Sequence, residues 1–511
     1  MTAKTPCTRA SATESLASNQ DLALLQRQLW KQQIRLAEVT RLLKEAREQL
    51  DRINGSRSWR ITAPLRAVAS CLHSWRLGAG DPPGHVKDPS ERLHLPTADD
   101  RELPRAGANR WLMVDVTELA IEDLRGGIQH VVKGVLGELL LAPPVGWDVV
   151  PIRLTRSGYY VDATGPLKEV FGPLGENHEG GRRIVARTGD VFLGHDLVRD
   201  HSTLLRQGVA SLKQQGAEVH FVVYDLLPVD LPECFPPGIP DRFERWLSVV
   251  ADLADGVACI SATVAQRFAR WAASCEARKT LPRMASFRLG IEDREGCVRE
   301  EVSRERSATV SFLMVGTIEP RKRYGEALDA MERLWSDGAD VSLVIVGREG
   351  WLSRQLADRI RNHRHYGGRL QWLEFATDEN VYEAYRHADC LLLCSLGEGF
   401  GLPVVEAASC GVPLVLRDLP ELREIAGDAA TYFGGRDGQS DLHSVLQQWL
   451  DDRAGGAIPS SRNVALISWA QCTKELLNVV GVDSGRRTDS NAALVEKSPG
   501  FAARVRTDKK D

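Results

Sequence analysis

The sequence predicts an α/β protein in which two doubly wound domains follow each other and a coiled coil precedes them. The chain has 511 residues, which is too long for one ordinary hydrophobic core. Short apolar runs alternate with stretches of helical spacing in two sets, the first from Trp111 and the second from near Ser311. This alternation is typical of parallel sheets that are covered on both faces. Before both sets, leucine recurs every seven residues, which indicates a coiled coil.

Residues 1–20 are polar and predict a disordered N-terminus, and the heptad repeat occupies residues 21–54. Its leucines are Leu22, Leu29, Leu36, Leu43 and Leu50. A repeat sustained over about four heptads indicates self-association, or the binding of a partner enzyme, through a coiled coil. A single amphipathic helix packed on its own domain is the alternative. Gln32 at a core position fits the coiled coil as a register marker.

A basic amphipathic helix is predicted for residues 55–78, where leucine and tryptophan share one face and arginines supply positive charge. Such a helix suits an anionic bilayer surface, and packing against the body of the protein is the alternative. Residues 79–107 are rich in proline and charge and predict a linker. We expect neither the coiled coil nor the basic helix to add a strand to a sheet, so the body from about Ala108 should fold without residues 1–107.

The composition is that of a globular protein, with 43% hydrophobic and 26% charged residues and a net charge of −4. This balance provides no general attraction to nucleic acid. No stretch approaches the roughly 20 consecutive apolar residues of a transmembrane helix, so we expect none. The first 20 residues lack the apolar segment of a secretory signal, so we expect no such signal. The ten cysteines form no CxxC pair, and Cys390 and Cys394 lie in an apolar run. We therefore expect buried thiols, rather than a metal site, in a reducing cytoplasm.

The first doubly wound domain is predicted for residues 108–300 and the second for residues 301–480. The strands of the first are the runs "WLMVDV", "WDVVPIRL", "GDVFLGHD", "EVHFVVYDLLP" and "ADGVACIS". The strands of the second are "SFLMVGT", "DVSLVIVG", "LQWLEFA", "DCLLLCS" and "GVPLVLRD". The polar residues 481–511 predict a disordered tail. Ligands of such sheets bind beyond the carboxyl ends of the strands, so a site is expected there.

The segment after "DCLLLCS" combines glycines with two glutamates. The glycines of "GEGFG" remove side chains, so that main-chain N–H groups can approach a ligand. Pro403 fits the first turn of a helix, whose N-terminus attracts phosphate. Glu398 is expected to project from the loop and Glu406 from the first turn of the helix, and both suit sugar or ribose hydroxyls as acceptors. A favourable interaction with the helix dipole is the alternative for Glu406.

A second cluster follows the strand in "FLMVGTIEPRKR". It consists of three consecutive cations in the loop, Arg321, Lys322 and Arg323. Cations at the carboxyl end of a strand can neutralise a diphosphate. A solvated run of charge is the alternative. The position at the expected ligand edge favours the diphosphate.

In this order and spacing, the two clusters resemble those of the retaining glycosyltransferases of family 4, which have the GT-B fold of two Rossmann-like domains. "EGFGLPVVE" matches the E-x7-E element of the family. "VGTIEPRK" takes the place of its glycine-arginine…lysine loop, with Thr317 where that arginine often stands and Arg321 as its substitute. The N-terminal half resembles a polysaccharide or O-antigen mannosyl- or rhamnosyltransferase branch through "RGGIQHVVKGVL", "GDVFLGHDL" and "FVVYDLLPVDLPECFP". The resemblance covers about residues 110–478.

The resemblance implies a role for each residue of the two clusters. Glu398 would hold hydroxyls of the transferred sugar, and Glu406 would hold those of the ribose. Arg321 and Lys322 would offset the charge on the departing diphosphate. Other residues would present backbone to the sugar and the diphosphate: Gly399, Phe400, Gly401 and Leu402 from this loop, and Gly126 and Gly127 from a turn of the first domain. The cations would stand in for a metal, so no metal and no cofactor is expected beside the nucleotide-sugar substrate.

One position departs from the pattern of the family. Relatives often have a histidine-aspartate pair after the fourth strand of the first domain, where this chain has Tyr224-Asp225. A second candidate pair, His195-Asp196, ends another strand, and His195 can equally be a packed loop histidine. Asp225 is expected to orient the acceptor hydroxyl rather than act as a general base. Retention of configuration implies front-side attack, in which the donor phosphate itself can accept the proton.

The sequence therefore predicts a retaining glycosyltransferase that moves a hexose or deoxyhexose, with mannose or rhamnose favoured, to a lipid-linked cell-surface glycan. It would act in the cytoplasm, peripheral to the inner face of the plasma membrane. Two alternatives stay open: a coiled-coil scaffold with a degenerate transferase body, and another GT-B enzyme such as a nucleotide-sugar epimerase. The presence of Glu398, Glu406 and Lys322 counts against the scaffold. The membrane-directed N-terminal segment counts against an enzyme with a soluble substrate.

Overall fold

The computed structural model describes residues 95, 99–105, 107–123, 126–171, 181–275, 281–292, 309–434 and 441–482. The predicted disordered N-terminus, coiled coil and basic amphipathic helix lie outside these ranges, as does nearly all of the predicted tail. The chain divides into two compact units, Met1–Leu141 with Val149–Val219, and Ala142–Asp148 with His220–Asp511.

The first sheet has the strand order β1-β5-β4-β3-β2-β6-β7-β8-β9. Its strands are β1 (Asp99–Glu102), β2 (Arg110–Asp115), β3 (Trp147–Leu154), β4 (Tyr160–Asp162), β5 (Arg182–Arg183), β6 (Val191–Gly194), β7 (Glu218–Val223), β8 (Gly256–Cys259) and β9 (Arg283–Ser286). The accompanying helices are α4 (Thr117–Ile121), α5 (Gly127–Leu141), α6 (Thr164–Phe171), α7 (Ser202–Gln214), α8 (Leu227–Asp230), the 3-10 turn η2 (Pro232–Cys234), α9 (Ile239–Leu253) and α10 (Ala262–Ser274). All five apolar runs predicted for this region form strands, namely β2, β3, β6, β7 and β8.

The strands that the sequence did not predict are short, and β4 runs antiparallel to both β3 and β5. The sheet is therefore mixed rather than wholly parallel. Strand β1 lies inside the predicted linker, residues 79–107, and pairs with β5. Arg105 of the same segment forms an ion pair with the buried Asp190 and lies 3.8 Å from the ring centroid of Trp111. The segment predicted as a linker therefore contributes a strand to the first sheet.

The second sheet is wholly parallel and has the order β12-β11-β10-β13-β14-β15. Its strands are β10 (Val310–Val315), β11 (Val341–Val346), β12 (Leu370–Leu373), β13 (Cys390–Leu393), β14 (Leu414–Arg417) and β15 (Thr431–Phe433). Its helices are the 3-10 turn η3 (Pro320–Lys322), α11 (Tyr324–Ser336), α12 (Arg354–Arg361), α13 (Asp378–His387), α14 (Leu402–Ser409), α15 (Pro420–Ala426) and α16 (Leu442–Gly455). The five predicted runs form β10 to β14. The strand order reverses between β10 and β13, which is the point where doubly wound sheets bind ligands.

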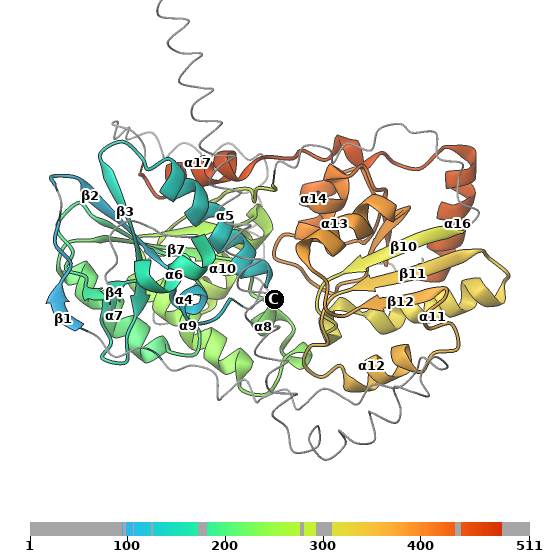
Figure 1. Ribbon diagram of the computed structural model, residues 1–511, viewed down its shortest axis with the longest axis horizontal. Coiled ribbons are helices and arrows are strands. Elements are labelled where there is room, and N and C mark those ends of the chain that lie inside the picture. Colours follow the sequence, from blue (N-terminus) through green and yellow to red (C-terminus); the bar gives the residue numbers. More distant parts are fainter. Residues whose placement is uncertain are drawn as a thin grey trace, which may run out of the picture. The chain divides into compact units, whose positions relative to one another are not determined.

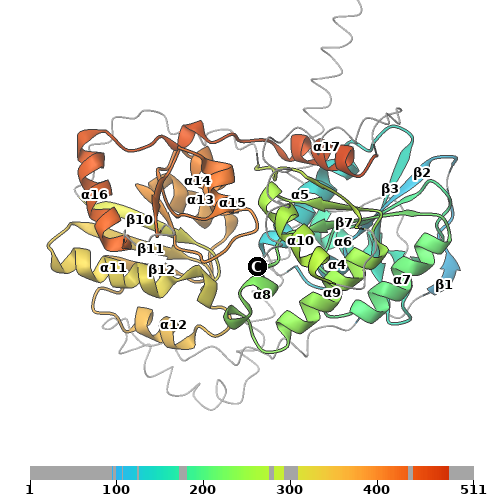
Figure 2. The same ribbon diagram turned by 180° about the vertical axis from the view of Figure 1, so that it is seen from behind.

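Helices cover both faces of this second sheet, which explains why its strands are continuous apolar runs. On one face α11 and α16 pack together (Figure 1). Phe312 of β10 contacts Trp449 of α16, with ring centroids 5.4 Å apart. The connections through α13 and α14 cross the other face, as right-handed crossovers require (Figure 2). Cys390 and Cys394 are buried free thiols, as predicted.

The last described helix is α17 (Trp469–Val479), which follows the 3-10 turn η4 (Ser461–Asn463). Ser468 caps its start, and Glu475 forms an ion pair with Arg288 at 2.5 Å. The main-chain N–H of Ile291 also donates to the carbonyl of Ile467 at 2.9 Å. One side of this helix is buried through Trp469, Cys472 and Leu476. No helix in the described part of the chain is long and apolar enough to cross a bilayer.

Candidate active site

Two loops leave the carboxyl edge of the second sheet side by side, because β10 and β13 are parallel neighbours. One loop runs from Gly316 through η3, and the other runs from Cys394 to the start of α14. They are joined where the main-chain N–H of Leu396 donates to the carbonyl of Arg321 at 2.8 Å. The two clusters predicted from the sequence are therefore one cluster.

Glu398 is buried at the centre of this cluster. Its Oε1 atom accepts hydrogen bonds from Nζ of Lys322 at 2.5 Å and from the hydroxyl of Ser395 at 2.6 Å. Its Oε2 atom accepts a longer contact of 3.3 Å from Arg321. Arg321 also forms an ion pair with the buried Glu319 at 2.7 Å. Two cations and two carboxylates thus compensate one another in a site that is largely shielded from water.

The charges of this cluster keep Glu398 ionised. Burial alone would raise the pKa of Glu398, but the positive charges of Lys322 and Arg321 outweigh it and hold the pKa at about 2. Burial raises the pKa of Glu319, and the same two cations oppose that rise. An ionised carboxylate can only accept hydrogen bonds, so Glu398 can bind hydroxyl donors.

The glycines of the loop are required by neighbouring protein atoms. A Cβ atom at Gly399 would lie 2.1 Å from the carbonyl oxygen of Tyr224, which no side chain tolerates. Gly401 has a φ of +106°, and a Cβ atom there would lie 2.9 Å from Leu422. The sequence predicted close approach of a ligand at these glycines, whereas the structure shows close approach of the chain itself. The carbonyl of Gly399 also accepts a hydrogen bond from the hydroxyl of Ser261 at 3.1 Å.

Glu406 lies on α14 and accepts a hydrogen bond from the hydroxyl of Tyr385 at 2.7 Å. Because α14 begins at Leu402, Glu406 is in its second turn, and the prediction of the first turn is wrong. The interaction with the helix dipole falls off within the first turn, so this alternative loses its basis. Pro403 does lie in the first turn, as predicted.

Asp225 follows β7 and lies against the glycine loop. Its Oδ1 atom accepts a hydrogen bond from the main-chain N–H of Leu227 at 3.0 Å. A Cβ atom at Gly399 would lie 3.2 Å from its Cβ. Burial raises the pKa of Asp225, and the charge of Arg321 opposes that rise. The structure thus brings Asp225 to the same cluster as Glu398, Lys322 and Arg321.

The other predicted site residues differ in their exposure to solvent. Thr317 is exposed at the start of the first loop, and Phe400 is buried. Gly126 and Gly127, at the start of α5 in the first unit, are exposed, and a Cβ atom at Gly126 would meet nothing within 4 Å. Packing of the described residues therefore does not require a glycine at residue 126, unlike residue 399.

In the first unit, His195 and Asp196 follow β6 and are buried. Burial lowers the pKa of His195 to about 3, so its imidazole is neutral at physiological pH. Asp196 accepts hydrogen bonds from the main-chain N–H groups of Leu119 at 2.8 Å and Leu197 at 2.9 Å. Burial nevertheless raises the pKa of Asp196 to about 6.

Sequence reasoning missed Asp115 at the carboxyl end of β2. This carboxylate is buried and accepts hydrogen bonds from the hydroxyl of Thr117 at 2.5 Å and that of Tyr160 at 2.8 Å. Burial outweighs these contacts and raises the pKa of Asp115 to about 7. The available signal was an aspartate that ends an apolar strand run. Ser395 and Tyr385, which contact the two predicted glutamates, were also missed.

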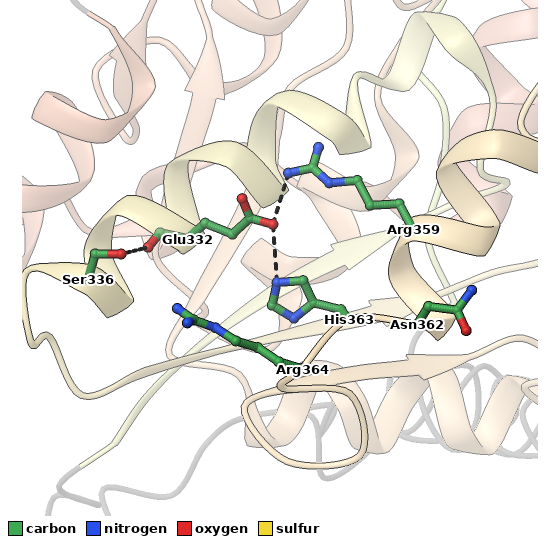
Figure 3. A pocket seen from close by; sticks show the side chains of 6 residues that line it. All are labelled: Glu332, Ser336, Arg359, Asn362, His363 and Arg364. Carbon is green, nitrogen blue, oxygen red and sulfur yellow. Dashed lines mark hydrogen bonds and ion pairs between the residues drawn. The ribbon is translucent and has the colours of Figure 1, made fainter.

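A separate surface hollow of about 580 Å³ lies beside α11 and α12 (Figure 3). Its lining residues are Glu332, Ser336, Arg359, Asn362, His363 and Arg364. Glu332 accepts from Arg359 at 2.9 Å and lies 3.1 Å from the His363 ring (Figure 3). No predicted site residue lines this hollow. Across the described ranges, no three histidine, cysteine, aspartate or glutamate side chains are grouped in a way that could hold a metal ion.

Comparison with known proteins bears on the part of the chain that carries both loops. Residues 300–464 match the family model described as "Glycosyl transferases group 1". This chain contains a group 1 glycosyltransferase domain. The domain includes the whole cluster around Glu398 except Asp225, and it includes Glu406 with Tyr385.

Two curated relatives of this chain come from Escherichia coli. This chain is 34% identical over 380 residues to "Serotype-specific mannosyltransferase WbdA". The aligned region covers 72% of this chain and 46% of that protein. This chain is also 32% identical over 170 residues to "O-antigen chain mannosyltransferase B". That aligned region covers 32% of this chain and 44% of that protein. The chain spans about half the length of the curated relatives it matches. A solved sucrose-phosphate synthase from Thermosynechococcus elongatus is 17% identical, with 74% of this chain and 95% of that chain covered and a TM-score of 0.48.

Proposed function

We propose that this chain is a retaining glycosyltransferase of family 4 with the GT-B fold, which transfers mannose from a nucleotide-diphospho-sugar to a lipid-linked glycan of the O-antigen type. The observation that carries the proposal is the cluster of Glu398 with Lys322 and Arg321 at the reversal of strand order, followed by Glu406 on the next helix. Mannose is chosen because the two Escherichia coli relatives described above are mannosyltransferases. Rhamnose is the sugar to test against it.

The proposed chemistry is electrostatic. Glu398 would accept hydrogen bonds from hydroxyls of the sugar, because a carboxylate has about four acceptor positions. Among the residues that the structure describes, Oε2 receives only the long contact from Arg321. Lys322 and Arg321 would offset the negative charge that grows on the diphosphate as it leaves. Such preorganised charge in a shielded site usually contributes a large part of catalysis.

The remaining roles follow from position. Glu406, oriented by Tyr385, would bind the ribose hydroxyls. Thr317 and the main chain of residues 399–402 would face the diphosphate. Gly126 and Gly127 keep the role that the resemblance implies, main-chain N–H groups for the donor. Asp225 would orient the acceptor hydroxyl. The donor is a substrate, and the proposal includes no metal and no cofactor.

The proposed location is the cytoplasm, at the inner face of the plasma membrane. The seven cysteines in the described ranges are all free thiols, which suits a reducing compartment. Binding to the bilayer would come from the basic segment at residues 55–78, and self-association from residues 21–54. Sedimentation with anionic liposomes at low and high salt tests the first, because salt screens attraction between arginines and lipid.

The decisive experiment incubates the full chain with mannose and rhamnose donors of each common nucleoside diphosphate and a lipid-linked acceptor. Release of the nucleoside diphosphate identifies the donor, and NMR of the product gives the anomeric configuration. We expect turnover with a mannose donor, retention, and full activity in EDTA. Inversion, or activity that is lost in EDTA and restored by magnesium or manganese, would refute the retaining or the metal-independent part.

The same experiment separates the alternatives. A scaffold would turn over no donor while it still bound partner enzymes. An epimerase would change the sugar without a glycan acceptor and form no glycosidic product. Transfer to the acceptor excludes both.

A further inference from the structure

A carboxylate outside the predicted site holds the main chain of Glu398. Glu421 of α15 is fully buried, and its Oε1 atom accepts a hydrogen bond from the main-chain N–H of Glu398 at 2.8 Å. Its Oε2 atom accepts one from Arg267 of α10 at 2.9 Å. Glu421 therefore joins Glu398, at the centre of the cluster, to a helix 154 residues earlier in the chain.

The loop needs such a restraint. Glu398 stands between Gly397 and Gly399, and glycines allow more backbone conformations than other residues. If the peptide at Glu398 rotated, its carboxylate would leave Lys322. The contact with Glu421 holds the main chain of this residue, whereas Lys322 and Ser395 hold its side chain.

Arg267 is needed for Glu421 to serve this role. A buried carboxylate without a counter-charge is costly, and it would draw in water or protons. Arg267 supplies that charge, and it also reaches Asp230 at 3.3 Å. The arrangement places the counter-charge on one carboxylate oxygen and leaves the other for the loop.

The same helix offers a matched control. Glu424 lies one turn after Glu421 and also reaches α10, where it accepts from the main-chain N–H groups of Ala262 at 2.7 Å and Thr263 at 2.9 Å. Both glutamates thus join α15 to α10. Of the two, Glu421 alone has a hydrogen bond to the glycine loop among the contacts that the structure describes.

We propose that Glu421 is a positioning residue for Glu398 and that Arg267 is its obligatory counter-charge. The proposal rests on the proposed function, because it assumes that Glu398 contacts the transferred sugar. It assigns Glu421 no contact with substrate. A mispositioned Glu398 loses a contact that strengthens toward the transition state, so kcat falls while the donor KM changes little.

The kinetic test uses the full chain with Glu421→Gln, Arg267→Ala, Arg267→Lys and Glu424→Gln. We expect Glu421→Gln and Arg267→Ala to lower kcat roughly 10-fold or more, because a hydrogen bond to a charged group is lost or misdirected. Arg267→Lys should keep part of the activity, and Glu424→Gln should keep nearly all of it. In a Glu398→Gln background, Glu421→Gln should lower kcat no further, because its effect passes through the lost carboxylate.

Amide hydrogen exchange provides a measurement that needs no turnover. The peptide containing residues 395–402 should exchange faster in Glu421→Gln and Arg267→Ala than in the unaltered chain or in Glu424→Gln. If no donor turns over, the proposed function fails, and the exchange rates still decide whether Glu421 holds the loop. Unchanged exchange, equal losses in Glu424→Gln, or losses that add to those of Glu398→Gln would overturn the inference.

Discussion

The ammonium nitrogen of Lys322 lies 2.5 Å from Oε1 of Glu398, and both side chains are buried. Removal of the cation leaves Glu398 with Ser395 and the long contact from Arg321. We expect Lys322→Ala to lower kcat roughly 100-fold or more, as the loss of preorganised charge does elsewhere. Lys322→Arg should keep the positive charge and therefore part of the activity. The activity should stay below that of the unaltered enzyme, because a planar guanidinium cannot occupy the position of a compact ammonium. Steady-state kinetics with the identified donor measure both.

The neighbouring cation is the control for this prediction. Arg323 belongs to the same run of charge, but it is half-exposed and pairs with Glu326 at 3.2 Å. Arg323→Ala should leave kcat within a few-fold of the unaltered enzyme. Equal losses in Arg323→Ala and Lys322→Ala would mean that only the net charge of the loop matters.

Substitution of Glu398 and of Glu406 should change different kinetic constants. Glu398→Ala removes a contact to the reacting sugar and should lower kcat. Glu406→Ala removes a contact to the ribose and should raise the donor KM roughly 10-fold. Tyr385→Phe should raise KM less, because it only releases Glu406, and Tyr382→Phe on the same helix is its control. Wild-type kinetics in both alanine variants would refute the donor site.

The stability of the protein should fall as pH rises toward neutrality, in part through Asp115. Its pKa is raised by burial from an ordinary 3.8 to about 7, so between these values the folded state holds a proton that the unfolded state has released. The free energy of unfolding then decreases with pH by up to about 1.4 kcal/mol per pH unit for this one group. Asp115→Asn should remove that part of the slope.

Urea unfolding between pH 5 and 8 tests the sign of this effect. The exposed Asp241 provides the control substitution, Asp241→Asn, on α9. If the slope of the unaltered chain and that of Asp115→Asn were the same, Asp115 would not titrate in this range.

The boundary of the folded body should lie before β1, not at Ala108. A chain that lacks residues 1–107 loses β1 and leaves Asp190 without Arg105, and the loss of one partner from a buried ion pair costs roughly 3–5 kcal/mol. A chain that lacks only residues 1–90 should keep the stability of the full body. Urea unfolding of both, beside Arg105→Ala in the full chain, measures the difference. Equal stability of the two truncations would contradict the importance of β1.

The sequence predicted the strands that form continuous apolar runs, and it missed short strands such as β4 and β5, which have three and two residues. The apolar runs of β10 and β11 are visible because helices cover both faces of their sheet. Strand β5 consists of Arg182 and Arg183, and such a short polar pair has no pattern to detect. Its pairing with β1 is set by the rest of the sheet, not by local preference.

The candidate site was predicted as far as its residues are adjacent in the sequence. The spacing of Glu398 and Glu406 and the cations at Arg321 and Lys322 are local patterns. The hydrogen bond between Glu398 and Glu421 and the ion pair between Glu421 and Arg267 join residues far apart in the chain. Only the folded chain brings them together, so no motif could have revealed them.

Cys394 begins the loop that carries Glu398, and its thiol is fully buried. Burial also raises the pKa of this thiol, so it forms little of the thiolate that alkylating reagents attack. Reaction at Cys394 therefore requires that the start of the loop leave its packed position. The rate at which an alkylating reagent labels this residue, read by mass spectrometry in the unaltered protein, reports how often the loop opens. A donor that binds to the packed form of the loop should slow that labelling. The labelling rate of Cys394 therefore reports donor binding without an introduced label.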